Sequence, residues 1–362
     1  MKTRMTVTLI ILLLAGVTAA VAVENLTLQQ ASQLAVEQNP AIRQSEINVE
    51  RAERASEQAD ESETILDRLR EEGLLTPDVE QLLDLLPAQA EQGEKMARLA
   101  RDLVRNQVIL EARQNYLEVQ KARENKNLAK QNLQRAEEMV RLATVSYNHG
   151  MTPRSDVLGA EAQVAAAQAA LLAAENQVEL AALELNNTLG RRLDASLSVA
   201  ELQSVPKPGR PNLESGLSSA LKKRIEIEQA KGEVELQETQ LEYVQENFSE
   251  EDAVHRQAEL DLEEARLNLE ITKKNVELQV RQLYSGMEVL KKQEQALEKS
   301  VKAAEESYRL ACLRYEAGVT TQMEVTGAQT TLLELETQLL HVRYDRYLMY
   351  QQWLFATARD LD

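Results

Sequence analysis

The residues that could carry out chemistry are few and widely separated in this chain. The three histidines, His149, His255 and His341, and the lone cysteine, Cys312, never lie one helical turn apart, the spacing that suits metal ligands. Paired acids that could act as catalytic carboxylates lie in strongly polar surroundings: Glu137-Glu138, Glu250-Glu251-Asp252 and Glu305-Glu306. The sequence contains no glycine-rich phosphate loop and no nucleophile motif. We therefore predict no enzyme, no metal site and no cofactor, with Cys312 packed as a small residue and the acids on solvated faces.

The composition indicates long helices. Of 362 residues only 12 are Gly and 7 are Pro, so helix-breaking residues are scarce. Aromatic residues make up 3%, too few for the girdles of a transmembrane β-barrel. A net charge of -18 argues against a nucleic-acid partner, and a single cysteine excludes a disulfide framework.

The N-terminus has the pattern of an export signal. A basic start is followed by an apolar run and a small-x-small motif: Lys2, Arg4, Val7 to Leu14, and Ala20-Val21-Ala22. We predict a signal peptide over residues 1–22 and a mature protein that works in the periplasm and cell envelope. The alternative is an uncleaved anchor, which the shortness of the apolar run disfavours.

The rest of the chain contains one unit twice. A shift of 168 residues, without a gap, aligns 113–160 with 281–328 and makes fifteen of forty-eight positions identical. Twelve of these identities lie in the last twenty-five positions, around a glycine. We predict a first helical repeat over 23–190, a linker over 191–211 that holds three prolines, and a second helical repeat over 212–362.

Each repeat reads as a long helix, a tight turn and a long return helix. Apolar residues recur every seven positions along the return helix of the first repeat: Val157, Val164, Leu171, Val178 and Leu185. Such a repeat predicts left-handed supercoiling of paired helices. The uncharged stretch 162–174 is 13 residues long and suits a helix seam better than a membrane span. A helix over about 98–148 would be roughly 75 Å long, which makes the molecule a rod.

Two glycine turns close the hairpins. In 148–153 and in 318–321, Gly150 and Gly318 are suited to the left-handed conformation that ends a helix. Thr152 is placed to cap the first return helix, with Pro153 at its first position. In the second turn, Thr321 and Glu324 have the spacing of a capping box.

Together these motifs resemble the TolC-like outer-membrane efflux protein family. The matching features are the segment Leu-x-x-Ala-x-x-Leu-Ala-x-x-x-Asn-Pro, from Leu28 to Pro40, and two turns of the form Tyr-x-x-Gly-x-Thr-x-x-x-Asp/Glu-Val. A weaker copy of the first segment lies at 213–227. The resemblance covers nearly the whole mature chain.

The resemblance implies a homotrimer in which four helical strands per chain build a twelve-helix periplasmic tunnel below a small β-barrel. It also implies two partners, a periplasmic adaptor (membrane fusion) protein and an inner-membrane pump. The adaptor would meet the helical turns. On this sequence the docking tips would comprise Gly150, Thr152, Asp156 and Val157 in the first repeat, and Gly318, Thr320, Glu324 and Val325 in the second. Alternatively, Asp156 and Glu324 face the lumen as a cation-selective ring.

One departure from the family concerns the barrel. Family members insert two membrane strands between the first and second long helices of each copy. Here those places, 65–87 and 243–252, contain no alternating apolar run with aromatics. We therefore predict an all-α fold of duplicated long antiparallel coiled-coil hairpins with little or no β-barrel. The leucine-rich segment 69–86, with Pro77 and Pro87 as helix breaks, would cap the bundle or dip into a membrane interface.

Two functions follow from these observations. The first is an outer-membrane-efflux-type channel component of a tripartite export system, a helical conduit that docks an adaptor and pump. The second is a barrel-less coiled-coil spacer in the cell envelope. A third, an adaptor subunit, lacks the β-rich segments it would need. An apolar stripe on only one side of each hairpin would favour the spacer, because a tunnel wall must contact neighbours on two sides.

Overall fold

The protein is described from a computed structural model that covers residues 25–72, 77–200, 205–249 and 252–358. These residues contain long helices and no β-strand; Leu26 and Val199 form an isolated parallel bridge. The helices are α1 (Leu28–Gln38), α2 (Pro40–Glu71), α3 (Pro77–Asn148), α4 (Arg154–Thr188), α5 (Leu213–Lys223), α6 (Ile225–Asn247), α7 (Ala253–Glu316) and α8 (Gln322–Ala356). The predicted all-α class is confirmed. The predicted signal peptide, residues 1–22, lies outside the described residues.

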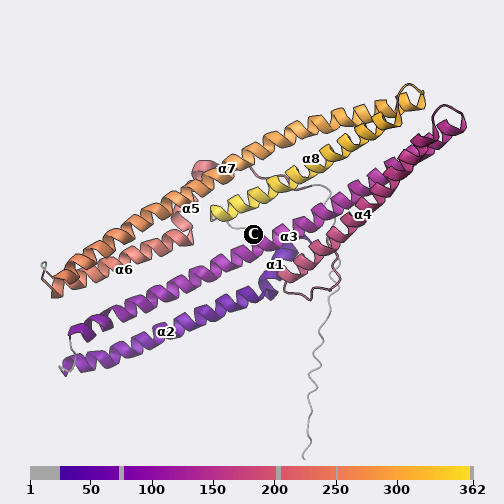
Figure 1. The fold of residues 1–362 in the computed structure, drawn as a ribbon. Coiled ribbons are helices and arrows are strands. Elements are labelled where there is room, and N and C mark those ends of the chain that lie inside the picture. Colours follow the sequence, from indigo (N-terminus) through magenta and orange to yellow (C-terminus); the bar gives the residue numbers. More distant parts are fainter. Residues whose placement is uncertain (1–24, 73–76, 201–204, 250–251, 359–362) are drawn as a thin grey trace, which may run out of the picture.

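The helices form a rod with two ends and a middle (Figure 1). Helices α3–α4 and α7–α8 make two hairpins whose turns lie together at one end, while α2–α3 and α6–α7 extend to the other. The short helices α1 and α5 lie near the middle. With 72 residues, α3 is about 108 Å long at 1.5 Å per residue. It begins at Pro77, well before the predicted start near residue 98.

At the end opposite the hairpin turns, α2 ends at Glu71 and α3 begins at Pro77, while α6 ends at Asn247 and α7 begins at Ala253. The predicted helix break at Pro87 is wrong, because α3 continues through this residue. Proline removes one intrahelical hydrogen bond there, and the packing of α3 on α2 offsets that loss. Of the segment 243–252, the first half is helical, since α6 continues to Asn247. Of the leucine-rich segment 69–86, residues 73–76 lie outside the described part.

The Asn-Pro motif fixes the middle of the first repeat. Thr27 caps α1 in a capping box with Gln30, and Asn39 ends the helix. The Asn39 side-chain amide donates to the Thr188 carbonyl at the end of α4, at 2.9 Å. Beside it, Gly190 has a φ of 65°, and a Cβ on this glycine would lie 2.3 Å from the Gln38 carbonyl oxygen. Glycine is therefore required where α4 ends against the α1–α2 junction.

Inside the first hairpin the contact between helices is made largely by alanine. Helix α4 buries Ala160, Ala167, Ala181 and Leu185 against α3. Alanine allows the two backbones to approach closely, as the seven-residue pattern predicts. The predicted coiled-coil pairing is confirmed.

Between the hairpins the contact combines apolar packing, such as that of Met139 with Val325, with polar pairs. Arg135 of α3 forms two 2.9 Å hydrogen bonds with Glu336 of α8, and Tyr308 lies under its guanidinium. The buried Gln329 side chain donates to the Asn132 side chain at 2.8 Å. Such pairs fix how the two hairpins lie against each other. We call this α3–α8 contact the central seam.

Candidate functional site

The two hairpin turns form one surface at the end of the rod (Figure 1). Met151 lies next to Gly318, and the side chain of Gln322 covers Gly159, so each turn contacts the other hairpin. Gly150 and Gly318 have φ values of 73° and 71°, which confirms their predicted left-handed conformation. The structure therefore brings the residues of the two repeats together in a single tip.

The helix starts at the tip differ between the repeats. Thr152 does not cap α4, which contradicts the prediction: the cap is Pro153, which makes no side-chain cap bond. The Thr152 hydroxyl turns toward Tyr315 of the other hairpin instead. Thr321 does cap α8 and accepts from the Glu324 backbone N–H at 3.4 Å. The Glu324 carboxylate does not complete the box, because Thr320 and Arg314 bind it.

The eight predicted docking residues differ in exposure. Gly150, Gly318 and Glu324 are exposed, and Thr152, Asp156, Val157 and Thr320 are half-buried. Val325 is fully buried, within a cluster that contains Met139, Ala311 and Tyr315. Asp156 and Glu324 both lie in the first turn of a helix, where the helix dipole favours a negative charge.

Tyr315 links the two turns. Its side chain is buried, and its hydroxyl faces Thr152. Burial raises the pKa of Tyr315, and the negative charge of Asp156 adds to the increase, while the Thr152 hydroxyl opposes it. The phenol of Tyr315 therefore stays neutral in the folded protein to a higher pH than an ordinary tyrosine.

Sequence reasoning missed the most exposed apolar side chains of the tip. Val319 is 73% exposed and Met323 80%, and Met151 is also exposed. Met151 and Val319 directly follow the two turn glycines. An apolar residue within an otherwise polar turn is the signal that could have identified them. Exposed apolar groups gathered at one end of a molecule suit contact with another protein.

In the part of the chain that the structure describes, no three His, Cys, Asp or Glu side chains are grouped as metal ligands. Cys312 is half-buried on α7, and burial raises the pKa of its thiol. A raised pKa disfavours the reactive thiolate.

The profile of the outer membrane efflux protein family matches residues 86–191 and 240–354. These ranges hold both hairpins and more than half of the chain. The protein belongs to this family. Its members are transport proteins rather than enzymes, and the predicted resemblance is confirmed. No individually curated protein matches the sequence.

Solved channels share the fold across nearly their whole length. CusC is 14% identical, with a TM-score of 0.76 over 93% of each chain. The outer membrane protein VceC of Vibrio cholerae is 15% identical, with a TM-score of 0.75 over 92% of this chain and 97% of that one. The MtrE channel of Neisseria gonorrhoeae is 17% identical, with a TM-score of 0.69 over 92% of this chain and 89% of that one. At such identities the likeness establishes the efflux-protein fold and no more.

Proposed function

We propose that three copies of this chain close into a helical conduit in the periplasm, associated with the outer membrane, whose tips dock a periplasmic adaptor and inner-membrane pump. The conduit serves export. Family membership supports the transport role, and the surface of the single chain supports the ring.

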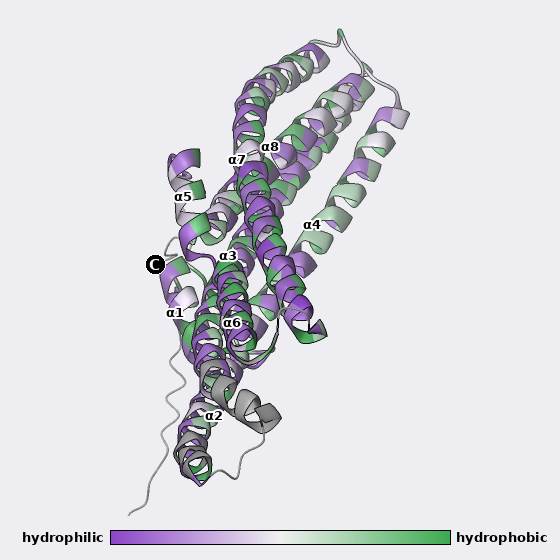
Figure 2. Ribbon diagram, turned by 90° about the vertical axis from the view of Figure 1, so that its left-hand side faces the viewer, coloured by the Kyte–Doolittle hydropathy of each residue, from purple (hydrophilic) through white to green (hydrophobic). Residues whose placement is uncertain are grey.

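The first support is the order of the helices in the tip half of the rod. Helix α4 packs on α3, α3 on α8, and α8 on α7, so α4 and α7 are the two edges of a row. Residues 154–188 form a helix long and apolar enough to cross a membrane by composition, yet little of its most apolar stretch is buried. Figure 2 shows α4 pale to green along much of its length. We interpret this outer face as a packing surface for another copy.

Both edges carry an apolar stripe opposite their buried face. On α4 the stripe comprises Leu158, Leu172, Leu180 and Leu183, all exposed. On α7 the stripe lies mainly in the half of the rod away from the tip, and its five exposed residues follow at intervals of seven, four, seven and eleven and therefore share one face: Leu260, Leu267, Ile271, Leu278 and Val289. Two-sided stripes favour the tunnel wall over the spacer.

The observation that carries the proposal is an asymmetry between equivalent residues. Gln329 and Val325 of α8 are buried under the first hairpin, whereas their equivalents on α4, Glu161 and Val157, are exposed and half-buried. In the repeat, α4 corresponds to α8 and α7 corresponds to α3. The α3–α8 contact of the central seam should therefore have an equivalent contact between α7 and α4, which the single chain lacks. Packing α7 of one copy on α4 of the next supplies this contact. Such a head-to-tail contact generates a ring when the rotation closes.

Cross-linking tests the ring. The hydroxyls of Tyr315 and Thr152 face each other within the chain. In the proposed ring, the equivalent pair is Tyr147 of one copy and Thr320 of the next. In a Cys312→Ser background, the pair Tyr147→Cys and Thr320→Cys should give covalent species of two and three chains. The matched control replaces Thr320→Cys by Lys223→Cys, on α5 near the middle of the rod, and should stay monomeric. Absence of linked species, or a ladder beyond three chains, contradicts the closed trimer.

Docking is tested separately. The proposal is that the exposed tip residues, Gly150, Gly318 and Glu324 among them, meet the adaptor, with Thr152, Asp156, Val157, Thr320 and Val325 shaping the surface. Val319→Asp should reduce capture of the cognate adaptor by the assembled protein at least tenfold. Val254→Asp, the same substitution of an exposed valine at the start of α7, should leave capture unchanged. Equal effects of the two variants would refute docking at the tip.

A further inference from the structure

A group of cationic residues lies near the middle of the rod, on the linker between the two repeats and on α5. Between residues 205 and 224 the chain has five cationic residues and one acid, Glu214, although the whole chain carries a net charge of -18. Four of these cations are exposed and form no ion pair within the described part of the chain: Lys207, Arg210, Lys222 and Lys223. We call these four residues the basic strip.

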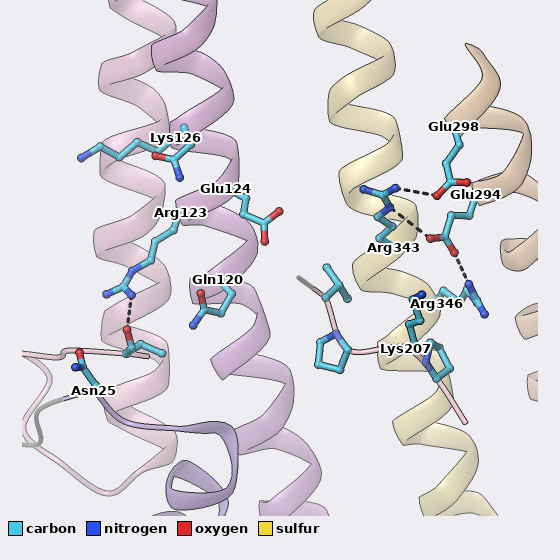
Figure 3. Close-up of a pocket in the computed structure, with 15 residues that line it drawn as sticks. Asn25, Gln120, Arg123, Glu124, Lys126, Lys207, Glu294, Glu298, Arg343 and Arg346 are labelled. Carbon is cyan, nitrogen blue, oxygen red and sulfur yellow. Dashed lines mark hydrogen bonds and ion pairs between the residues drawn. The ribbon is translucent and has the colours of Figure 1, made fainter. Parts of the chain in front are cut away.

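The linker packs closely against α8, so it carries its cations at fixed places. A Cβ on Gly209 would lie 2.3 Å from the Tyr350 hydroxyl, so the backbone approaches this side chain as closely as glycine allows. Pro208 restricts the backbone just before it. Figure 3 shows Lys207 beside Arg346 of α8. A backbone that is already ordered loses little conformational entropy when its side chains bind a partner.

The basic strip follows the rod and does not surround a pocket. The linker with Lys207 lies beside Lys291 of α7. Arg224, which follows Lys223, binds Gln279 of the same helix. The twelve positions from Gln279 to Lys291 correspond to roughly 18 Å of helix at 1.5 Å per residue. Cations spread along a line do not converge on a small ligand, but they match the repeated charges of a polymer.

The first repeat folds at the equivalent place without such cations. Helix α1 corresponds to α5, yet it has no basic residue in its last turn. The positions of Lys222 and Lys223 are occupied by Glu37 and Gln38 in α1. The helix dipole favours cations at the end of α5, but α1 shows that the fold does not require them. The linker cations lie outside any helix, so this effect does not account for them.

The side of the rod that carries α5 is open to large partners. The short helices α1 and α5 lie on the same side of the long helices (Figure 2). In the proposed ring the lumen has to stay open for cargo, so the side from which the short helices protrude is the outer one. The basic strip is then accessible from the surroundings of the conduit.

We propose that the basic strip binds the cell wall, an anionic polymer whose peptide stems carry carboxylates. The strip lies far from both ends of a rod whose longest helix is about 108 Å long, so a membrane at either end does not reach it. Salt screens charges more than about 10 Å away, so the polymer meets the local positive charge and not the net charge of the chain. The contact would hold the rod at its middle. It requires the location in the cell envelope, but neither the ring nor docking at the tip.

Co-sedimentation of the mature chain with purified cell-wall sacculi tests the contact. We expect saturable binding at low salt that is at least tenfold weaker in the variant Lys207→Gln/Arg210→Gln/Lys222→Gln/Lys223→Gln. A control variant removes the same charge from exposed positions elsewhere that also form no ion pair among the described residues: Arg51→Gln/Lys130→Gln/Arg154→Gln/Lys302→Gln. The control variant should bind like the parent, and circular dichroism verifies that each variant is folded.

Blocking the wall carboxylates tests the chemistry of the contact. Sacculi whose carboxyl groups have been converted to amides should bind the parent chain at least tenfold more weakly. Equal binding to blocked sacculi, or equal weakening in the control variant, would overturn the proposal. Stronger binding to phosphatidylglycerol vesicles than to sacculi would also overturn it, because it would assign the strip to a lipid surface. Binding by a chain that cross-linking shows to be monomeric would remove the ring and leave the wall contact in place.

Discussion

Tyr315 of the second hairpin and Tyr147 of the first occupy the same position in the repeat, yet 1% of one side chain and 43% of the other is exposed. Val325 of the second hairpin is likewise buried, whereas its equivalent Val157 is half-buried. The local sequence is nearly the same at both places, so the neighbour decides the burial. The second hairpin has its neighbour inside the chain, across the central seam, whereas in the proposed ring the first finds it in another copy.

Charge substitution at the two valines should break this comparison most strongly. Val325→Asp places an unpaired carboxylate in a fully buried cluster and should lower the free energy of unfolding by on the order of 4 kcal/mol. Val157→Asp should leave the stability of the single chain nearly unchanged and reduce trimer formation. Urea unfolding and light scattering measure the two effects. Equal loss of stability in both variants would contradict the asymmetry.

The next largest effect concerns the polar pair of the central seam. Glu336→Ala leaves Arg135 half-buried without its carboxylate and should lower the free energy of unfolding by about 2–3 kcal/mol. The equivalent position of the first repeat is Gln168, which is exposed. Gln168→Ala should change stability by less than about 0.5 kcal/mol. In the exchanged variant Arg135→Glu/Glu336→Arg, the free energy of unfolding measured by denaturation should partly recover. If it does not recover, the pair contributes only through packing.

Alkaline pH should weaken the central seam. Burial raises the pKa of Tyr308, Tyr315 and Tyr344, and Glu124 raises that of Tyr344 further. Since the unfolded chain releases these protons near pH 10 while the folded chain retains them, stability is complete below pH 10 and falls above it. The loss is up to about 1.4 kcal/mol per pH unit for each tyrosine. Urea midpoints from pH 8 to 11 should fall less steeply for Tyr344→Phe; an unchanged slope would show that Tyr344 ionises equally in both states.

The smallest effect should be the same in both hairpins. Gly150→Ala and Gly318→Ala each force a non-glycine residue into a left-handed conformation and should cost about 1 kcal/mol. A Cβ would meet no close contact at either position, so the backbone alone sets the cost. Thermal unfolding of the two variants should therefore match, whereas a much larger loss at Gly318 would show that the turns differ in more than their neighbours.

Local features of the fold could be predicted from the sequence because they depend on local chemistry. The end of α3 at Asn148, the left-handed Gly150 and Gly318, and the start of α2 at Pro40 all follow from residues within one turn. The absence of a cap at Thr152 could not be predicted, since its hydroxyl turns toward a residue far along the chain.

Contacts between the hairpins lay beyond the sequence for the same reason. The seven-residue pattern assigns a residue to a face but does not name the helix that covers it. Arg135 meets Glu336 across two hundred positions, and neither belongs to the repeated motif. At the tip, the pattern placed Val157 and Val325 alike, although only one of them is buried within the chain.

The bridge between Leu26 and Val199 has a consequence for how the protein is handled. It fixes the first described residues near the middle of the rod, and α8 ends there too, at Ala356 (Figure 1). Both extremities of the rod are therefore made of continuous chain. A fluorescent protein or affinity tag attached just after Ala356 would therefore leave from the waist, clear of the tip at which we propose docking.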